Sequence, residues 1–396
     1  MTVTDKYRVR VVNHISAGGL ERLPLDRFAV SADTDDPHAI LVRSADLHSI
    51  EIPESLLAVG RAGSGTNNIP IPRLSKRGIP VFNAPGANAN AVKELVVAGM
   101  LLAARNIDHA LKYLDSLDSE DPELKNKIEA GKKTFNGYEL ANHSLGVIGL
   151  GKVGCLVADA AIKLGMQVIG YDPDITVDSA WSLPASVKKA HSLGEVLKQS
   201  NFLTLHVPLV DATRGMIDAG GIAQMKPGAV VLNFSRGGVV DNTAILEALG
   251  SGQLSKYVCD FPDPQLTQQS GVILLPHLGA STREAEENCA VMVADQLRDY
   301  LLDGTIRNSV NFPDVILPRE SLFRVAIANA NVPNMVGGIS HEMAMAGLNI
   351  ATMTNKSRKE LAYTLVDVDS EVPDSVIKAI GAIDGVLMVR YLPLSN

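Results

Sequence analysis

Apolar residues in the middle of the chain recur in short runs that alternate with stretches of helical period. Six runs predict buried strands: LGVIGL (145–150), QVIGYD (167–172), FLTLHV (202–207), AVVLNFS (229–235), KYVCDF (256–261) and GVILLP (271–276). Buried strands that alternate with helices are typical of a doubly wound parallel sheet. We therefore predict an α/β fold for this region.

The N-terminal region has the same pattern on a smaller scale. Four apolar runs broken by glycine and proline predict a small α/β unit: YRVRVVN (7–13), AILVRS (39–44), LLAVGRAG (56–63) and IPVFNA (79–84). Apolar residues at helical spacing predict one long helix from Asn90 to Leu114, which crosses to the next domain. A charged segment at 118–133 then predicts a loop.

The C-terminal region, residues 323–392, reads strand, helix, strand, strand, helix, strand. This βαββαβ order is that of a ferredoxin-like fold. About 70 residues make a small core, so we expect its sheet to pair with that of a partner. The predicted domains are a substrate-binding domain at 1–88 and 284–312, a nucleotide-binding domain at 89–283 and a third domain at 322–396.

A glycine turn follows the first strand of the central region without a gap. In GLGKVG, Gly149 turns tightly, Gly151 lets a backbone approach a pyrophosphate, and Gly154 lets the next helix pack close to the sheet. Asp172 ends the next strand, where a carboxylate suits a ribose diol and repels a ribose phosphate. The pattern predicts a dinucleotide site that prefers NAD to NADP, the alternative being a merely tight turn.

Charge and composition narrow the class of ligand. The chain has 36 basic and 44 acidic residues and a net charge of -8, which argues against a nucleic-acid partner. Cys155, Cys259 and Cys289 lack the spacing of metal ligands, so we expect reduced thiols, no metal and a cytoplasmic protein. The longest apolar run, at 95–104, is too short to span a bilayer, so no membrane partner is expected.

Polar residues follow three of the central strands. Because ligands of open α/β sheets bind beyond the carboxyl ends of the strands, Arg236, a carboxylate (Asp260 or, by preference, Asp263) and His277 are candidates for one site. An arginine fork holds a carboxylate, an imidazole exchanges protons near neutral pH, and NAD accepts a hydride. This set predicts oxidation of a 2-hydroxy acid. The alternative for each residue is an ordinary surface or turn position.

The ordered motifs VRSA (42–45), GRAGSGTNN (60–68), GLGKVG, HVPL (206–209), NFSRGGVVD (233–241) and PHLGAST (276–282) resemble those of D-isomer-specific 2-hydroxyacid dehydrogenases. The C-terminal unit resembles an ACT regulatory domain. The resemblance implies a Rossmann-type domain inserted in the substrate domain. The long apolar helix and the small C-terminal sheet both favour a partner, so we expect a homodimer or homotetramer. The resemblance also implies that Arg236, Asp263 and His277 are catalytic, although Asp263-Pro264 stands where the family has Glu-Pro.

Further site residues are implied by the same resemblance. The NAD contacts are Ser64, Gly149, Gly151, Lys152, Val153, Gly154, Asp172, Val207, Phe234, Ser235, Arg236, Asp260, His277, Leu278, Gly279 and Ala280. The substrate contacts are Arg43, Arg61, Ala62, Gly63, Ser64, Lys132 and Lys133, and the effector contacts are Asn329 and Asn331.

The expected substrate is a phosphorylated 2-hydroxy acid. We expect oxidation of 3-phospho-D-glycerate to 3-phosphohydroxypyruvate, which feeds serine biosynthesis, because Arg43 and Arg61 supply cations for a phosphate. Two alternatives remain. One is another enzyme of the family, a glyoxylate or hydroxypyruvate reductase or a D-lactate dehydrogenase. The other is a corepressor-like protein that senses NADH.

Overall fold

The computed structural model describes residues 6–394, which form two compact units. The first unit combines the segment up to Asn88 with the segment from Arg283 onward, and the second unit is Ala89–Thr282. The chain is α/β, with two parallel sheets and a small antiparallel C-terminal sheet. The predicted fold class is confirmed.

The second unit is built on a seven-stranded parallel sheet, with the order β12-β11-β10-β9-β6-β7-β8. The order reverses between β6 and β9, which is the crevice where doubly wound folds bind nucleotides. Its strands are β6 (Ser144–Ile148), β7 (Gln167–Tyr171), β8 (Lys188–Lys189), β9 (Phe202–Leu205), β10 (Ala229–Asn233), β11 (Leu254–Cys259) and β12 (Val272–Leu274).

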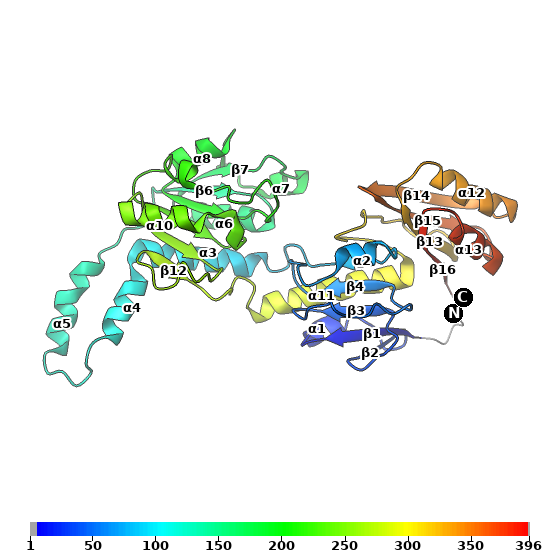
Figure 1. Cartoon of the computed structure of the whole chain (residues 1–396), viewed down its shortest axis with the longest axis horizontal. Helices are drawn as coiled ribbons and strands as arrows, with labels where there is room; N and C mark the ends of the chain where they lie inside the picture. The colour runs from blue at the N-terminus through cyan, green and yellow to red at the C-terminus, as the bar shows by residue number, and fades with distance from the viewer. Residues whose placement is uncertain (1–5, 395–396) are drawn as a thin grey trace. The chain divides into compact units, whose positions relative to one another are not determined.

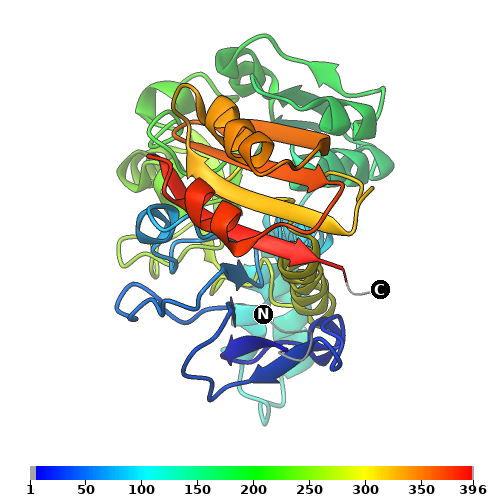
Figure 2. The same ribbon diagram turned by 90° about the vertical axis from the view of Figure 1, so that its right-hand side faces the viewer.

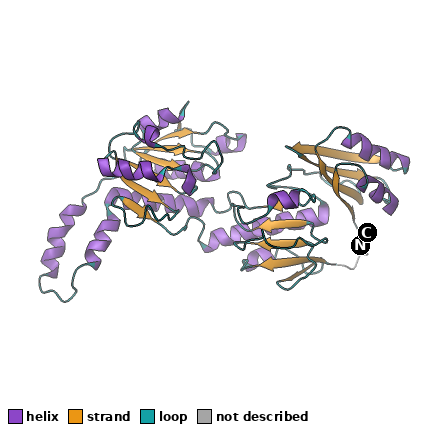
Figure 3. Cartoon of the chain, viewed as in Figure 1, coloured by secondary structure: helices purple, strands orange, loops and turns teal. Residues whose placement is uncertain are grey.

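Helices cover both faces of this sheet (Figure 3). Every residue of β9 and β10 is buried, as expected for parallel strands between two helical layers. One core packs α3 and α6 on the sheet, and the other packs α8 and α10. The helices are α3 (Ala89–Arg105), α4 (Ile107–Asp115), α5 (Leu124–Gly131), α6 (Lys152–Lys163), α7 (Val177–Ser182), α8 (Leu193–Gln199), α9 (Ala219–Ile222) and α10 (Asn242–Ser251), with short 3-10 turns at Lys132–Phe135 and Gly237–Val239.

The predicted helix from Asn90 to Leu114 is wrong as a single element. Asn106 adopts a left-handed backbone conformation with a φ of 49°, which ends α3 and starts α4 in a new direction. The charged segment predicted as a loop contains α5. In Figure 1, α4 and α5 form a helical arm that stands away from the seven-stranded sheet, and neither helix has a buried residue.

The first unit contains a five-stranded parallel sheet with the order β2-β1-β3-β4-β5. Helix α11 packs on it so closely that a Cβ atom on Gly60 of β4 would lie 2.4 Å from Val293. The elements are β1 (Tyr7–Val12), α1 (Ala17–Leu20), β2 (Phe28–Ser31), β3 (Ala39–Val42), β4 (Ala58–Arg61), α2 (Ile71–Ser75), β5 (Val81–Phe82) and α11 (Arg283–Asp303).

The C-terminal part of the first unit is the predicted βαββαβ arrangement. Its antiparallel sheet has the order β14-β15-β13-β16, and α12 and α13 lie side by side on one face (Figure 2). The elements are β13 (Phe323–Ala330), α12 (Met335–Met345), β14 (Ile350–Arg358), β15 (Leu361–Val368), α13 (Asp374–Gly381) and β16 (Val386–Pro393).

The other face of this small sheet is also buried within the first unit. Ala326, Tyr363 and Leu365 join the same hydrophobic core as Tyr300 of α11. The Tyr363 hydroxyl donates a hydrogen bond to the carbonyl of Gly304 at 2.8 Å. A domain of about 70 residues has only a small core of its own, and the rest of the first unit supplies the additional core. Pairing with a partner's sheet stays a prediction.

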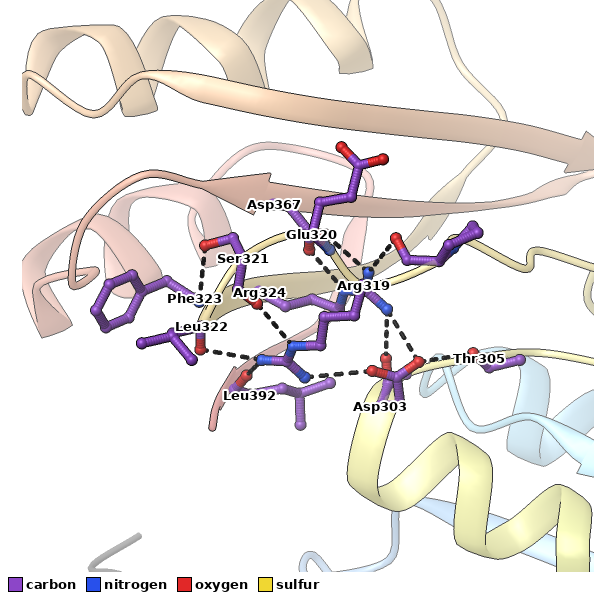
Figure 4. Close-up of polar contacts among 12 residues, drawn as sticks. Asp303, Thr305, Arg319, Glu320, Ser321, Leu322, Phe323, Arg324, Asp367 and Leu392 are labelled. Atoms are coloured by element: carbon purple, nitrogen blue, oxygen red, sulfur yellow. Dashed lines mark hydrogen bonds and ion pairs between the residues drawn. The ribbon is translucent and has the colours of Figure 1, made fainter. Parts of the chain in front are cut away.

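Two arginines of the small sheet cap the C-terminus of α11: Arg324, which binds Asp303 (Figure 4), and Arg390. Arg324 donates to both carboxylate oxygens of Asp367, at 2.6 and 2.8 Å, and to the carboxylate and carbonyl of Asp303, at 3.0 and 3.2 Å. Arg390 donates to the carbonyls of Tyr300 and Leu301 at 3.0 and 2.7 Å. The last carbonyls of a helix have no partner within the helix, so the small sheet completes α11.

Two further observations concern the cysteines and the length of the helices. Cys155, Cys259 and Cys289 are free and buried, and burial raises the pKa of each thiol. Over residues 6–394, no helix combines the length and apolar character that crossing a membrane requires.

Candidate active site

The glycine turn between β6 and α6 has the geometry that a pyrophosphate needs. Gly149 has a φ of 88°, and a Cβ atom there would lie 2.6 Å from the carbonyl oxygen of His206. A Cβ atom on Gly154 would strike the carbonyl oxygen of Gly149 at 2.0 Å, whereas one on Gly151 would meet nothing within 4 Å. The turn is tight at both ends and open in the middle, where α6 begins and its free amides face outward.

The predicted ribose carboxylate lies beside this turn. Asp172 accepts hydrogen bonds from the amides of Leu150 and Asp174, at 2.8 and 2.9 Å. A carboxylate has about four acceptor positions, so two amides leave acceptors for ribose hydroxyls. Lys152 and Val153 begin α6 next to the open side of the turn. Asp172 therefore fits the ribose of NAD, and the turn with Lys152 and Val153 fits its pyrophosphate.

Two other predicted cofactor contacts are partly buried by the protein. The Phe234 side chain is 6% exposed and packs on α3, where a Cβ atom on Gly99 would lie 3.0 Å from its ring. Its side chain is therefore part of the hydrophobic core. Val207 lies at the glycine turn, with its side chain 3.0 Å from the position of a Cβ atom on Gly149.

A buried amide shapes the loop that carries Arg236. Asn233 ends β10 with no exposed surface. Its side-chain oxygen accepts from the amide and hydroxyl of Ser235 at 3.1 and 3.0 Å, and its nitrogen donates to the carbonyl of Arg236 at 2.9 Å. The Arg236 side chain itself is exposed. Sequence reasoning missed Asn233, because it acts through the backbone rather than on a ligand.

His277 lies in a loop that Asp260 holds. The Asp260 carboxylate is 1% exposed, and its two oxygens accept from the amides of Leu278 and Gly279, both at 2.7 Å. His277 has a φ of 59°, which is uncommon for a residue other than glycine and is often found at functional sites. The ring of Phe261 meets the His277 ring edge to face at 5.0 Å. Both oxygens of Asp260 are therefore used to shape this loop.

Asp263 has a different role in this structure. Its side chain accepts from the amide of Gln265 at 2.9 Å, which is a turn motif. No hydrogen bond or ion pair between Asp263 and His277 occurs in the part of the chain that is described. Asp263 lines a cavity of about 380 Å³ with Gly237, Gly238 and Phe261. The pairing of Asp263 with His277 stays a prediction.

The predicted substrate cations of the first unit follow neighbouring strands. Arg43 comes after β3 and Arg61 ends β4. Arg43 forms an ion pair with Glu286 of α11 at 2.6 Å. Burial raises the pKa of the Cys289 thiol, and the charges of Arg61 and Arg43 both lower it. The charges of both guanidinium groups are therefore felt at the same thiol of α11.

Two asparagines shape the backbone around these arginines. Asn68 donates to the carbonyls of Ala45 and Arg43 at 2.7 and 3.3 Å, and Asn83 donates to the carbonyl of Ser64 at 2.6 Å. The turn at Gly63, with a φ of 156°, has its amide bonded to the carbonyl of Arg61 at 2.8 Å. Sequence reasoning missed both side chains, for the same reason as Asn233.

The remaining predicted residues lie elsewhere. Lys132 and Lys133 belong to the helical arm, where Lys132 forms an ion pair with Glu129. Asn329 and Asn331 line a cavity of about 160 Å³ in the C-terminal sheet, together with Asn355. The Oδ1 atom of Asn329 is buried and accepts no hydrogen bond from any described residue.

The comparisons with known proteins agree with this geometry. Residues 97–279 match the family model of the D-isomer specific 2-hydroxyacid dehydrogenase NAD-binding domain. Together with a relative that is 33% identical and covers 93% of this chain, this match shows that the chain belongs to the D-isomer specific 2-hydroxyacid dehydrogenase family. It is an NAD-dependent oxidoreductase of that family, and the predicted family and cofactor are confirmed.

Two relatives match nearly the whole chain. A D-3-phosphoglycerate dehydrogenase of Escherichia coli strain K12 is 33% identical over 387 residues, which cover 93% of this chain and 90% of the relative. One from Dictyostelium discoideum is 29% identical and covers 98% of both chains. The crystal structure of cofactor-bound 3-phosphoglycerate dehydrogenase from Entamoeba histolytica shares the fold, with a TM-score of 0.61 and 23% identity over 78% of this chain and 99% of that one.

Proposed function

We propose that this chain oxidises 3-phospho-D-glycerate to 3-phosphohydroxypyruvate with NAD, and so feeds serine biosynthesis. The observation that carries the proposal is the pair Arg43 and Arg61, which lie at the ends of neighbouring strands beside the Gly63 turn. A substrate with one carboxylate needs one arginine fork, which Arg236 supplies; two further cations suit a phosphate. The relatives' names and their coverage of both chains support the same substrate.

The proposed reaction uses three groups of this chain. His277 takes the proton of the C2 hydroxyl as general base. Arg236 binds the carboxylate and the carbonyl that forms. In the first unit, the Ser64 amide is left for the substrate, because the amides of Ala62 and Gly63 donate to the carbonyls of Val42 and Arg61 at 2.7 and 2.8 Å. NAD, when bound, supplies the hydride acceptor. Asp260 keeps the loop of His277 in place through the amides of Leu278 and Gly279.

A substrate panel tests the proposal. NADH oxidation is measured with 3-phosphohydroxypyruvate, hydroxypyruvate, glyoxylate and pyruvate. We expect kcat/KM to be highest for the phosphorylated substrate. Preference for an unphosphorylated 2-oxo acid would establish another dehydrogenase of the family instead. NADH binding without any turnover would indicate a corepressor-like sensor.

Replacement of His277 tests its role separately. General acid-base catalysis contributes about 10²- to 10⁴-fold, so His277→Ala is expected to lower kcat by that factor. The dissociation constant for NADH, measured by fluorescence, should change little because the glycine turn is intact. Full turnover in the variant would refute the assignment.

We further propose that the cavity at Asn329 and Asn331 binds a small effector. It is polar and about 160 Å³ in volume, and the unpaired Oδ1 of Asn329 offers an acceptor for an ammonium group. Titration with L-serine and glycine tests this proposal. Inhibition that Asn329→Ala abolishes would support it, and activity that neither amino acid changes would refute it.

We propose that the chain forms a homodimer or homotetramer through the helical arm. Ile107, Leu111 and Leu114 of α4 are 37%, 56% and 48% exposed and share one face of the helix. Lys132 and Lys133 belong to the same arm, which gives them a route to a partner's substrate. The free, buried cysteines support a reducing compartment such as the cytoplasm.

A further inference from the structure

The second unit has another cavity, at the amino edge of its seven-stranded sheet. The cavity has a volume of about 280 Å³, and its lining includes Ser144 and Gln167, the first residues of β6 and β7. Arg236 and His277 follow the carboxyl ends of strands in the same parallel sheet. A five-residue strand at about 3.3 Å per residue separates the two edges by about 16 Å. The cavity is therefore distinct from the candidate active site.

Three lysines line this cavity: Lys188 of β8, Lys198 of α8 and Lys226 before β10. No Asp or Glu lines it, and within residues 6–394 none of the three lysines forms an ion pair. Lys163 of the same unit, by contrast, pairs with Asp159 at 2.7 Å. Positive charge is thus gathered here without a protein counter-charge.

Neutral groups hold one of these lysines in position. The ammonium of Lys226 donates to the hydroxyl of Ser144 at 3.2 Å and to the side-chain oxygen of Asn201 at 3.4 Å. The Ser144 hydroxyl in turn donates to the same Asn201 oxygen at 2.8 Å. An ammonium has three donors, so one remains. Ser144 and Asn201 are uncharged, so they fix the position of the Lys226 ammonium and leave its charge unneutralised.

The chain has a net charge of -8, whereas the lining of this cavity includes three lysines and no carboxylate. Ammonium groups around one cavity repel one another, and a bound anion offsets this repulsion by attracting each of them. Ammonium groups bind phosphates as point charges. The volume lies just below the range of about 300–1,000 Å³ typical of drug-sized ligands, which suits a small molecule.

We propose that Lys188, Lys198 and Lys226 form an anion site that binds a small phosphate-bearing molecule, either inorganic pyrophosphate or a small organic phosphate ester. The site requires no contact with the substrate or the cofactor. The proposal does not rest on the identity of the substrate, because none of these lysines belongs to the candidate active site.

Calorimetric titration of the full chain tests the site, with inorganic pyrophosphate and glycerol 2-phosphate as the two probes. The test variant is Lys188→Gln/Lys198→Gln/Lys226→Gln. Its matched control is Lys189→Gln, which removes an exposed lysine of the same strand that does not line the cavity. We expect the triple variant to bind at least tenfold more weakly than the unmodified chain. The control should stay within twofold.

The preferred probe identifies the source of the phosphate. Tighter binding of pyrophosphate indicates an inorganic ligand, and tighter binding of glycerol 2-phosphate indicates an ester. Equal binding by the triple variant and the unmodified chain would overturn the proposal, as would equal weakening by Lys189→Gln. NADH binding and kcat of the triple variant should be unchanged, which separates a failure of this site from a failure of the proposed function.

Discussion

The Asp260 carboxylate connects β11 to the loop that carries His277. Its two bonds to backbone amides are short, at 2.7 Å each, and the carboxylate is almost fully buried. Hydrogen bonds to a charged group contribute about 1.5–3 kcal/mol. Since both oxygens are engaged by protein amides, we assign Asp260 a positioning role and expect its removal to affect His277 more than cofactor binding.

Asp260→Asn tests this role. The amide side chain accepts only one of the two backbone bonds and sets its own N–H against the other donor. A rise of about 1.4 kcal/mol in the activation free energy lowers a rate tenfold. We expect kcat to fall about 10- to 100-fold. The KM for NAD should stay within about threefold. A variant that raises KM for NAD and leaves kcat unchanged would show instead that Asp260 acts mainly as a cofactor ligand.

His206 lies at the base of the glycine turn and predicts a pH dependence of stability. Burial lowers its pKa from the ordinary value of 6.5 to about 3. The unfolded chain therefore binds more protons than the folded chain between these values. The stability contribution of neutral His206 is complete above pH 6.5 and is lost as the pH falls toward 3.

The measurement is the free energy of unfolding in urea at pH 7 and pH 4.5. His206→Gln removes the titrating group, so we expect this variant to lose less stability between the two pH values than the unmodified chain. His191→Gln is the control, because His191 is exposed in the same unit. Equal losses in the unmodified chain and in His206→Gln would contradict the assignment.

At the scale of elements, most strands were predictable, whereas the short strands β2 and β8 and the breaks between helices were not. The C-terminal strands β13 and β16 form where alternating or apolar runs of β-branched residues predict them. The run from Asn90 to Leu114 keeps its helical period through Asn106, so nothing in the period marks the left-handed residue. Helix α5 is short and has no buried residue, and its large apolar residues are Leu124 and Ile128 alone, which is too few to give a clear periodic signal.

The cap on α11 gives a prediction for the C-terminal sheet. Arg324→Met leaves Asp367 fully buried without a counter-charge, which costs about 3–5 kcal/mol. We expect hydrogen exchange in peptides covering β13 and β15 to accelerate by about 10²- to 10³-fold. The double variant Arg324→Met/Asp367→Leu removes both charges and should restore most of the protection. A single variant that exchanges as slowly as the unmodified chain would show that the pair contributes little.

At the scale of the whole molecule, residues that face a ligand were predictable and residues that shape the backbone were not. Arg236 and His277 follow apolar runs, and their chemistry is visible in the sequence. Asn68, Asn83 and Asn233 act by binding carbonyls and amides of neighbouring loops. An asparagine in a loop is usually a turn residue, so only the folded chain distinguishes these three.

The helical arm gives a prediction for assembly. Within the arm, Tyr113 ties α4 to the following segment through the carbonyl of Lys127, at 2.7 Å, and through the ring of Phe135, at 5.3 Å. The apolar stripe of α4 remains exposed, which favours a second copy of the chain as its cover.

The double variant Leu111→Glu/Leu114→Glu tests this assembly. It places two charges on the stripe and should raise the dissociation constant of the oligomer at least tenfold. Light scattering after size exclusion measures the mass at micromolar concentration. Lys112→Glu changes the charge of the arm away from the stripe and should leave the mass unchanged. A monomeric unmodified chain, or an oligomer that the double variant preserves, would show that the arm does not hold the subunits together.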